Sequence, residues 1–434
     1  MNSNLLVGYK DIINNKNKQF RMHIKHLGLT LICASLVSTA MASGYRIPEN
    51  SIRSTALSSA YVANAQGADA AYHNPAAMVF NEDAQFLEAS INYIYLNAID
   101  FNGTMTSPLW GGGTNNVNES SEAQHFFIPS LHYTSEAYGN TRFGFSMTTP
   151  VGLTKRWLAP NTGTYSEKFS LKTIELNPSI AYQVSDNFSI AAGARALLSR
   201  GVIRMRNTIT NYSRKMEGDS VDYGYNLALH FKPSDTVDLA LTYRSKIDIT
   251  AEGTATLTLG AFSYNNRHAS LTVPSPAVLA IGAAFDLDDK TTLEIAIDQT
   301  YWSAYKQLDF NYDSVLAPAN VFATFDAAQA RNWKDALAYR IGLTHEYDDK
   351  WTLMGAYVFD ETPVPEATLG VELPDSDAHV VSFGALYKVS NELTVGGSLL
   401  YDYKVSRNVN NSTINGEFTD AGATFITVGA ELKF

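Results

Sequence analysis

One stretch of the chain alternates strictly between apolar and more polar side chains. It covers residues 223–231 and reads YGYNLALHF, with an aromatic or aliphatic residue at every odd position. The same alternation recurs at residues 87–95 and 381–387. Because successive side chains of a β-strand point to opposite faces, this period of two predicts strands with one apolar and one more polar face. Soluble β-sandwiches share the pattern, so the spacing of the turns has to separate the two architectures.

The connections between these strands alternate in length from residue 84 onward. Six are short and polar, near 136–140, 185–187, 232–236, 286–291, 348–350 and 389–392. Seven are long, near 98–124, 151–171, 206–216, 251–269, 304–334, 361–377 and 405–421. Such connections join fourteen strands that begin and end on the short-turn side. Outer-membrane barrels have short periplasmic turns, long external loops and an even number of strands. We therefore predict an all-β fold, a 14-stranded antiparallel transmembrane β-barrel over residues 84–434.

The expected strands are 86–97, 125–136, 141–150, 172–184, 188–205, 217–231, 237–250, 270–285, 292–303, 335–347, 351–360, 378–388, 393–404 and 422–434.

Composition agrees with a barrel and excludes other classes. The 434 residues are 45% hydrophobic and only 17% charged, yet the mean hydropathy is −0.13. After residue 42 the longest apolar run, 277–285, has nine residues, against the roughly 20 that a spanning helix needs. The net charge of −11 argues against nucleic acid as a partner, because that function requires a basic surface.

The first 42 residues are expected to be an N-terminal extension and a signal peptide. Residues 22–42 combine a charged start, a short apolar core and an Ala-x-Ala ending, so we expect Met22 to be the true start and Ser43 the first mature residue. The single cysteine, Cys33, lies within this segment. Cleavage would leave 27 bases against 42 acids, a net charge of −15. An exported, acidic chain without cysteine indicates the cell outer membrane of a Gram-negative bacterium, without disulfides, metal or cofactor.

Residues 43–83 do not alternate and are rich in Ala, Ser, Asn and Gly. Two interpretations are open: a flexible periplasmic tail, or short helices packed as a small hatch inside the barrel lumen. Small residues allow the close backbone packing that a plug requires. Ser54 and Asp69 are candidate helix caps, and Asn74-Pro75 favours an extended or turn conformation.

These features together resemble the FadL family of outer-membrane long-chain fatty acid and hydrophobic-compound transporters. The most specific segments are Asn74-Pro75-Ala76 and the run from Asp360 to Pro365, which reads DETPVP. The resemblance covers the whole mature chain. It implies a barrel closed by a partly helical N-terminal hatch, passive diffusion of a ligand to a site beside the hatch, and lateral release into the bilayer near the third strand. Independently of the resemblance, the last strand ends with Leu432 and Phe434 on one face, and we expect the barrel assembly machinery to recognise this terminal Phe434.

A fatty acid needs an apolar pocket with one or two basic groups for its carboxylate. By position, the resemblance points to Arg200 on the fifth strand and Lys334 before the tenth, with Arg195 and Arg340 in reserve. The apolar phase of the fifth strand changes from even to odd positions beyond Gly201. A bulge at residues 199–201 would turn Arg200 into the lumen; a solvated arginine at a strand end is the alternative.

The resemblance also suggests roles for five hatch residues. Tyr45 and Ile47 would form an N-terminus that moves to open the site, and Asn74, Pro75 and Ala76 would contact a kinked third strand. Simple packing and an ordinary turn are the alternatives.

The external capture groove is expected to differ from that of the family, because the loop at 207–216 is short and polar. Apolar residues occur instead in two other loops: Leu257, Leu259, Phe262 and Tyr264 in one, and Leu316, Val321, Phe322 and Phe325 in the longest.

Long-chain fatty acids are the expected ligand, with aromatic hydrocarbons as the alternative within transport. An outer-membrane lipid hydrolase is the alternative from another class, because Gly218-Asp219-Ser220 resembles the nucleophile segment of some esterases. The expected partners are the hydrophobic ligand, outer-membrane lipid with lipopolysaccharide, and the assembly machinery. A monomer without enzymatic activity is expected.

Overall fold

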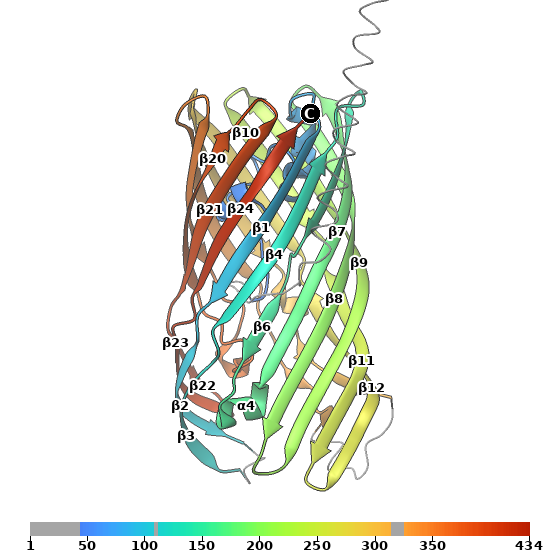
Figure 1. Cartoon of the computed structure of the whole chain (residues 1–434), viewed down its shortest axis with the longest axis vertical. Coiled ribbons are helices and arrows are strands. Elements are labelled where there is room, and N and C mark those ends of the chain that lie inside the picture. The colour runs from blue at the N-terminus through green and yellow to red at the C-terminus, as the bar shows by residue number, and fades with distance from the viewer. Residues whose placement is uncertain (1–43, 108–111, 314–324) are drawn as a thin grey trace, which may run out of the picture.

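The alternating segments form strands, and the strands close into an antiparallel β-barrel (Figure 1). The computed structural model describes residues 44–107, 112–313 and 325–434. The barrel has fourteen strands, and it closes where β1 (Phe86–Leu96) pairs with β24 (Ala423–Lys433). The backbones of Gln85 and Phe434 extend this pairing by exchanging two hydrogen bonds of 2.9 and 3.0 Å. The first and last strands of the barrel therefore meet at one seam.

The wall between β1 and β24 continues, in chain order, through β4 (Gln124–Thr134), β5 (Thr141–Thr148) with β6 (Leu153–Arg156), β7 (Lys168–Ser185), β8 (Phe188–Asn207), β9 (Tyr212–Ser234), β10 (Val237–Arg244) with β11 (Ile247–Leu259), β12 (Phe262–Ser275) with β13 (Val278–Asp288), β14 (Thr291–Thr300), β18 (Ala336–Glu346), β19 (Trp351–Asp360), β20 (Ala378–Lys388) and β21 (Leu393–Lys404). Three of the fourteen strands are thus each built from two segments.

A belt of exposed apolar side chains covers the outside of the wall. Its aliphatic members include Ile180, Ile190, Leu198, Leu227, Leu229, Leu239, Leu241, Ile281, Ile295, Ile297, Ile341, Leu343, Leu353, Val381, Ile426 and Val428. These side chains occupy one phase of each strand while the other phase is buried. A lipid-facing apolar band with an alternating inner face is the signature of a membrane-spanning barrel. Within the described residues, the structure has no helix that is both long and apolar enough to cross a membrane.

The two ends of the barrel differ. The short turns and the C-terminus lie at one end, the top of Figure 1. At the other end, β2 (Asp100–Thr106), β3 (Thr114–Ser120), β22 (Arg407–Asn410) and β23 (Ile414–Thr419) form a separate sheet, beside α4 (Pro160–Ser166). Short segments η3 (Trp302–Ala304), β15 (Gln307–Leu308), β16 (Phe310–Tyr312), β17 (Gln329–Ala330) and η4 (Glu366–Thr368) belong to the remaining connections.

Two segments that were predicted from the sequence to be long loops are mostly β-strand in the structure. The segment 206–216 is mostly strand, because β8 runs to Asn207 and β9 starts at Tyr212. The segment 251–269 is a hairpin of β11 and β12, which pair up to Leu259 and Phe262. Both hairpins extend past the apolar belt. Their outer face is polar there, so they lack the alternating apolar side chains from which the other strands were predicted.

Residues 44–83, called the hatch below, fill the lumen. They contain α2 (Ile52–Ala56), α3 (Ala70–His73) and η1 (Pro75–Phe80), and most of their side chains are buried. Small residues on both sides allow this packing: a Cβ on Gly384 of β20 would lie 2.6 Å from Cβ of Ala56, and one on Gly144 of β5 would lie 2.9 Å from Cβ of Ala71. The predicted extension and signal peptide, residues 1–42, lie outside the described residues.

Adding bulk at the contact between Gly384 and α2 should displace the hatch. A Leu at this position cannot fit without movement of Ala56, and such overpacking costs about 1–3 kcal/mol. For Gly384→Leu we expect a barrel that still shows heat-modifiable gel mobility but has increased leak conductance in planar bilayers. Ala385→Leu, which adds similar bulk on the outer phase of β20, is the control. Equal leak in both variants would contradict this account of the hatch.

Candidate functional site

The third strand of the barrel is interrupted. β5 ends at Thr148 and β6 begins at Leu153, and the ladder between β4 and β5 spans only Leu131 to Thr134 on the β4 side. Residues 124–130 of β4 therefore have no ladder partner on that side within the described chain. The wall has a gap between its second and third strands.

The start of the hatch pairs with the interruption from inside the barrel. Arg46 forms a bridge with Val151. The Ile47 amide donates to the Pro150 carbonyl at 2.8 Å, and the Gly152 amide donates to the Tyr45 carbonyl at 2.8 Å. The hatch thus satisfies backbone groups that a continuous strand would have paired with its neighbour.

An aromatic cluster holds Tyr45 in place. Its ring centroid lies 4.6 Å from that of Trp302, 5.8 Å from Trp333 and 6.2 Å from Tyr305. Its hydroxyl donates to the Pro274 carbonyl at 2.6 Å. The preceding residue, Gly44, has a φ of +73°, and a Cβ there would lie 2.6 Å from the Trp333 ring. Only glycine can bring the chain this close to the two indoles.

A narrow, mainly apolar pocket lies beside this cluster, and its walls enclose about 410 Å³, a figure that includes space open to solvent. Its lining is Tyr45, Leu153, Phe169, Leu171, Val273, Tyr305, Arg331, Trp333, Val364, Thr368, Gly370, Glu372 and Leu373. The Arg331 guanidinium forms an ion pair with the Glu372 carboxylate at 2.9 Å, and its side chain is only 9% exposed. The indole nitrogens of Trp302 and Trp333 are buried and have no acceptor among the described residues. The pocket combines apolar walls with buried donors.

A wider groove opens outward from the apolar pocket. It encloses about 1550 Å³, part of it open to solvent, and shares Arg331, Thr368, Gly370 and Glu372 with the pocket. Its other walls come from α4, β8, β9 and the connections around residues 367–372 and 411–414. The groove and the pocket therefore share one wall, formed around Arg331.

A third cavity lies on the other side of the hatch start and encloses about 660 Å³, part of it open to solvent. Its lining includes Arg46, Arg195, Arg244, Pro150 and Val151. Tyr45 lines the apolar pocket and the adjacent Arg46 lines this cavity, so the first hatch residues separate the two. The basic groups here are paired, Arg46 with Asp298 at 2.9 Å and Arg195 with Glu175 at 2.7 Å.

The four basic residues that the sequence suggested as ligand contacts lie in different environments in the structure. Arg195 is buried, and besides Glu175 it donates to the Ser245 carbonyl at 2.6 Å. Arg340 is buried on β18, where it donates to Asp298 at 3.2 Å and to the carbonyl of Ser58 in the hatch. Lys334 is exposed beside the buried Trp333.

The bulge predicted to turn Arg200 inward is wrong. β8 pairs with β7 and β9 without a register shift around residues 199–201, and the Arg200 side chain is outward and 60% exposed. Ile203 and Met205 continue the inward phase that contains Arg195. The apolar phase changes in the sequence because the environment changes: past the lipid belt, the inside of the barrel packs against the loop core and the outside meets water.

Asn74 and Ala76, which the sequence predicts to contact the third strand, hydrogen-bond to β9 and β8. The Asn74 amide lies 3.2 Å from His230 of β9, and Ser189 of β8 donates to the Ala76 carbonyl at 2.7 Å. Pro75 begins η1. Ala71 and Met78, on either side, approach Gly144 of β5. Of the apolar loop residues, Leu257 and Phe325 are buried in the outer core, whereas Leu316, Val321 and Phe322 lie outside the described residues.

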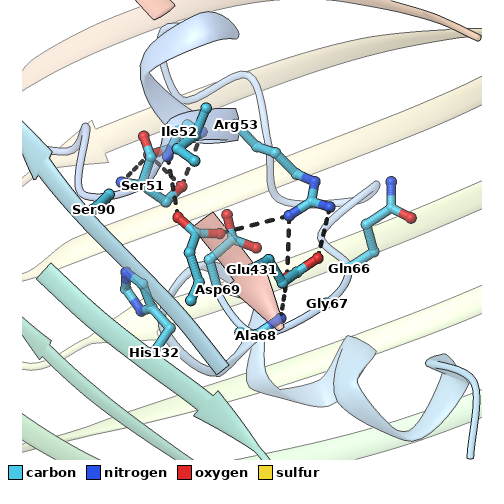
Figure 2. Close-up of polar contacts among 12 residues, drawn as sticks. Ser51, Ile52, Arg53, Gln66, Gly67, Ala68, Asp69, Ser90, His132 and Glu431 are labelled. Carbon is cyan, nitrogen blue, oxygen red and sulfur yellow. Dashed lines mark hydrogen bonds and ion pairs between the residues drawn. The ribbon is translucent and has the colours of Figure 1, made fainter. Parts of the chain in front are cut away.

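Barrel carboxylates anchor the hatch further from the gap, as Figure 2 shows for one of them. Glu431 of β24 pairs with Arg53 at 3.1 Å and accepts from the Ala68 amide at 2.9 Å (Figure 2). Glu88 of β1 accepts from the Ile52 amide at 3.2 Å. Glu294 of β14 accepts from three hatch amides, residues 62–64, at 2.6–3.0 Å. Residues 44–47 lie outside these three anchors and are held by the aromatic cluster, the third strand and the Arg46–Asp298 ion pair.

Sequence reasoning missed Arg331, Trp302 and the carboxylate anchors. Arg331 lies two residues before Trp333 and so shares its buried side of an extended segment. The anchors Glu88, Glu294 and Glu431 are acidic residues at inward-facing strand positions, and this is the signal in the sequence that could have identified them.

Comparison with known proteins adds a family and a set of relatives. Residues 33–434 match the family model described as "Outer membrane protein transport protein (OMPP1/FadL/TodX)". The "Long-chain fatty acid transport protein" of Escherichia coli O6:H1 is 24% identical over 425 residues, covering 86% of this chain and 90% of the relative. "Outer membrane protein P1" of Haemophilus influenzae is 24% identical over 419 residues, covering 83% and 88%.

Solved structures share the fold. A Pseudomonas aeruginosa FadL homologue superposes with a TM-score of 0.79 at 19% identity, covering 90% of this chain and 99% of that one. The Pseudomonas putida toluene transporter TodX gives a TM-score of 0.66 at 16% identity, covering 89% and 99%.

The hatch should dock more tightly at low pH. Burial raises the pKa of Glu49 from 4.5 to about 7, only partly offset by Arg340, and burial also raises the pKa of Asp69. A docked state with raised pKa values binds protons more tightly than a released state, so protonation stabilises docking. This stabilisation is fully present below pH 4.5 and is lost as the pH rises through 7. We expect leak conductance in planar bilayers to increase between pH 5.5 and pH 8. Glu49→Gln should flatten this increase, and an unchanged pH dependence in the variant would contradict the assignment.

Proposed function

Because this chain belongs to the OMPP1/FadL/TodX family of outer membrane transport proteins, we propose that it carries long-chain fatty acids across the outer membrane by passive diffusion. The observation that carries the proposal is the narrow apolar pocket with one buried cation, Arg331, beside the start of the hatch. A fatty acid presents an apolar chain and one carboxylate, and this pocket offers a counterpart for each. The relative in Escherichia coli named for long-chain fatty acid transport supports the same ligand class.

The carboxylate would bind at Arg331. Arginine forms strong, charge-assisted hydrogen bonds with carboxylates, and a fatty acid head group could replace Glu372 as its partner. The unpaired indole N–H groups of Trp302 and Trp333 offer two further donors nearby. Buried donors normally find acceptors, so a ligand oxygen would satisfy them. The exposed Lys334 would make an earlier contact during entry, and Arg195 and Arg340 would act beyond the hatch start.

The ligand would enter through the outer groove and leave through the gap in the wall. Displacement of residues 44–47, with Tyr45 and Ile47 as the moving side chains, would join the apolar pocket to the cavity at Pro150 and Val151. Those two residues belong to the interruption of the third strand, where β4 has free edge positions. Apolar lumen residues Phe126 and Ile128 lie on that edge. Lateral release there would keep the alkyl chain out of periplasmic water.

Aromatic hydrocarbons are the second candidate ligand. The aromatic cluster around Tyr45 and the apolar lining suit them, and TodX, a toluene transporter, shares the fold. A neutral hydrocarbon would leave the Arg331–Glu372 pair without a role, and this favours the fatty acid.

A hydrolase is disfavoured. Ser220 lies within the regular β8–β9 ladder, and its hydroxyl contacts Ser199 at 2.5 Å and Asp222 at 2.6 Å. That position differs from the sharp, exposed turn of an esterase nucleophile. We propose that the protein is not an enzyme and that it acts as a monomer.

Removal of the buried cation should separate the two ligand classes. For Arg331→Gln we expect uptake of labelled oleate to fall about tenfold or more, the effect of losing a charged hydrogen bond in a buried site, while toluene uptake stays unchanged. Lys334→Gln is the matched control, three residues away and exposed, and it should reduce oleate uptake less. Equal loss of oleate and toluene uptake, or a larger effect of Lys334→Gln, would refute the head-group role of Arg331.

A disulfide between the hatch and the third strand should make uptake depend on redox state. Arg46 and Val151 face each other between two flanking hydrogen bonds, a geometry with Cα atoms about 4.5 Å apart that accepts a disulfide. In Arg46→Cys/Val151→Cys we expect oleate uptake to be blocked under oxidation and restored by dithiothreitol. Each single variant is a control. Full uptake with the disulfide formed would show that the hatch start does not move.

A further inference from the structure

The outer face of β6 to β9 changes abruptly from apolar to basic. The last apolar row across three paired strands consists of Ile174, Leu198 and Val221. In the next outward row, two residues closer to the loop end, Lys172 lies opposite Arg200, which in turn lies opposite Asp219 of β9. This change marks the level at which the wall leaves the hydrocarbon on the side of the long connections.

A second basic row follows on four adjacent strands. Arg156 lies opposite Lys168, Lys168 opposite Arg204, and Arg204 opposite Lys215. Like charges directly opposite one another on neighbouring strands repel and destabilise the sheet. The two rows are four residues apart, roughly 13 Å along the strands. We call Arg156, Lys168, Lys172, Arg200, Arg204 and Lys215 the basic face.

The carboxylates of the chain leave most of this charge unbalanced. Within the part of the chain that the structure describes, Arg156, Lys168, Lys172 and Arg204 form no ion pair. Arg200 approaches Glu217 and Asp219 only at 4.0 and 3.9 Å, and Lys215 approaches Glu217 at 3.8 Å. The whole chain nevertheless has 43 acidic against 32 basic residues. A concentration of unpaired cations on an acidic protein calls for an anion from outside the chain.

We propose that the basic face binds the phosphate groups of lipopolysaccharide in the outer leaflet. The face borders the apolar belt, so a lipid whose acyl chains pack against Ile174, Leu198 and Val221 would place its anionic head group level with the cations. Arginine and lysine are the side chains that bind phosphate. The glycolipid would bridge β6–β9, and this role is independent of the transported ligand.

The test measures lipopolysaccharide that remains bound to the purified, full-length protein. Lys168→Gln/Lys172→Gln/Arg204→Gln removes three cations from the basic face. Lys290→Gln/Lys350→Gln/Lys388→Gln removes three exposed lysines from the short-turn end and is matched in charge. After exchange with a defined amount of diphosphorylated lipopolysaccharide in detergent, we expect the first variant to retain at least about tenfold less than the wild type and the control to match the wild type. Heat-modifiable mobility confirms that each barrel is folded.

Three further arms identify the ligand chemistry. Dephosphorylated lipopolysaccharide should bind the wild type as weakly as the diphosphorylated form binds the first variant. Neither phosphatidylglycerol micelles nor inorganic phosphate at the same phosphate concentration should displace bound lipopolysaccharide. Equal retention by both triple variants, retention independent of phosphorylation, or displacement by inorganic phosphate alone would overturn the proposal. Oleate uptake by the first variant should stay normal, so failure here is distinguishable from failure of the transport proposal.

Discussion

Every backbone N–H and C=O group within the hydrocarbon core must find a partner inside the protein, and this constraint determines how the barrel can open. A closed ladder satisfies it everywhere and leaves no way out for a ligand. In this protein the third strand breaks at residues 149–152, and the backbone of residues 45–47 pairs with the break from within. The same short segment therefore completes the wall and separates the apolar pocket from the cavity that Arg46 lines.

The remaining contacts of the hatch divide it into a fixed and a releasable part. Glu88, Glu294 and Glu431 bind hatch amides and Arg53, and all three carboxylates are largely buried, which strengthens the hydrogen bonds to them. The first hatch residues are held by ring contacts, two backbone hydrogen bonds and the ion pair of Arg46 with Asp298. Because one carboxylate binds residues 44–47 and three bind the rest of the hatch, we expect residues 44–47 to move while α2, α3 and η1 stay in place.

Much of the barrel could be predicted from the sequence, because alternation and turn spacing are local properties of a lipid-facing strand. The six tight turns and the strand number followed from them. The orientation of Arg200 could not be predicted in this way. The polarity pattern of β8 inverts where the strand leaves the membrane, although the register of β8 with β9 continues unbroken. The sequence likewise gave no sign that Arg331 would be enclosed by segments as distant as Leu153 and Leu373. Such enclosure depends on loops whose fold has no periodic signal.

The most direct test of the central claim, that a ligand occupies the pocket beside Tyr45 before the hatch start yields, is a crystal structure with a fatty acid brominated on its alkyl chain. The account predicts anomalous bromine density between Leu153, Phe169 and Leu171, with the carboxylate within hydrogen-bonding distance of Arg331. Bromine density confined to the outer lipid-facing surface, with the pocket unchanged, would contradict it.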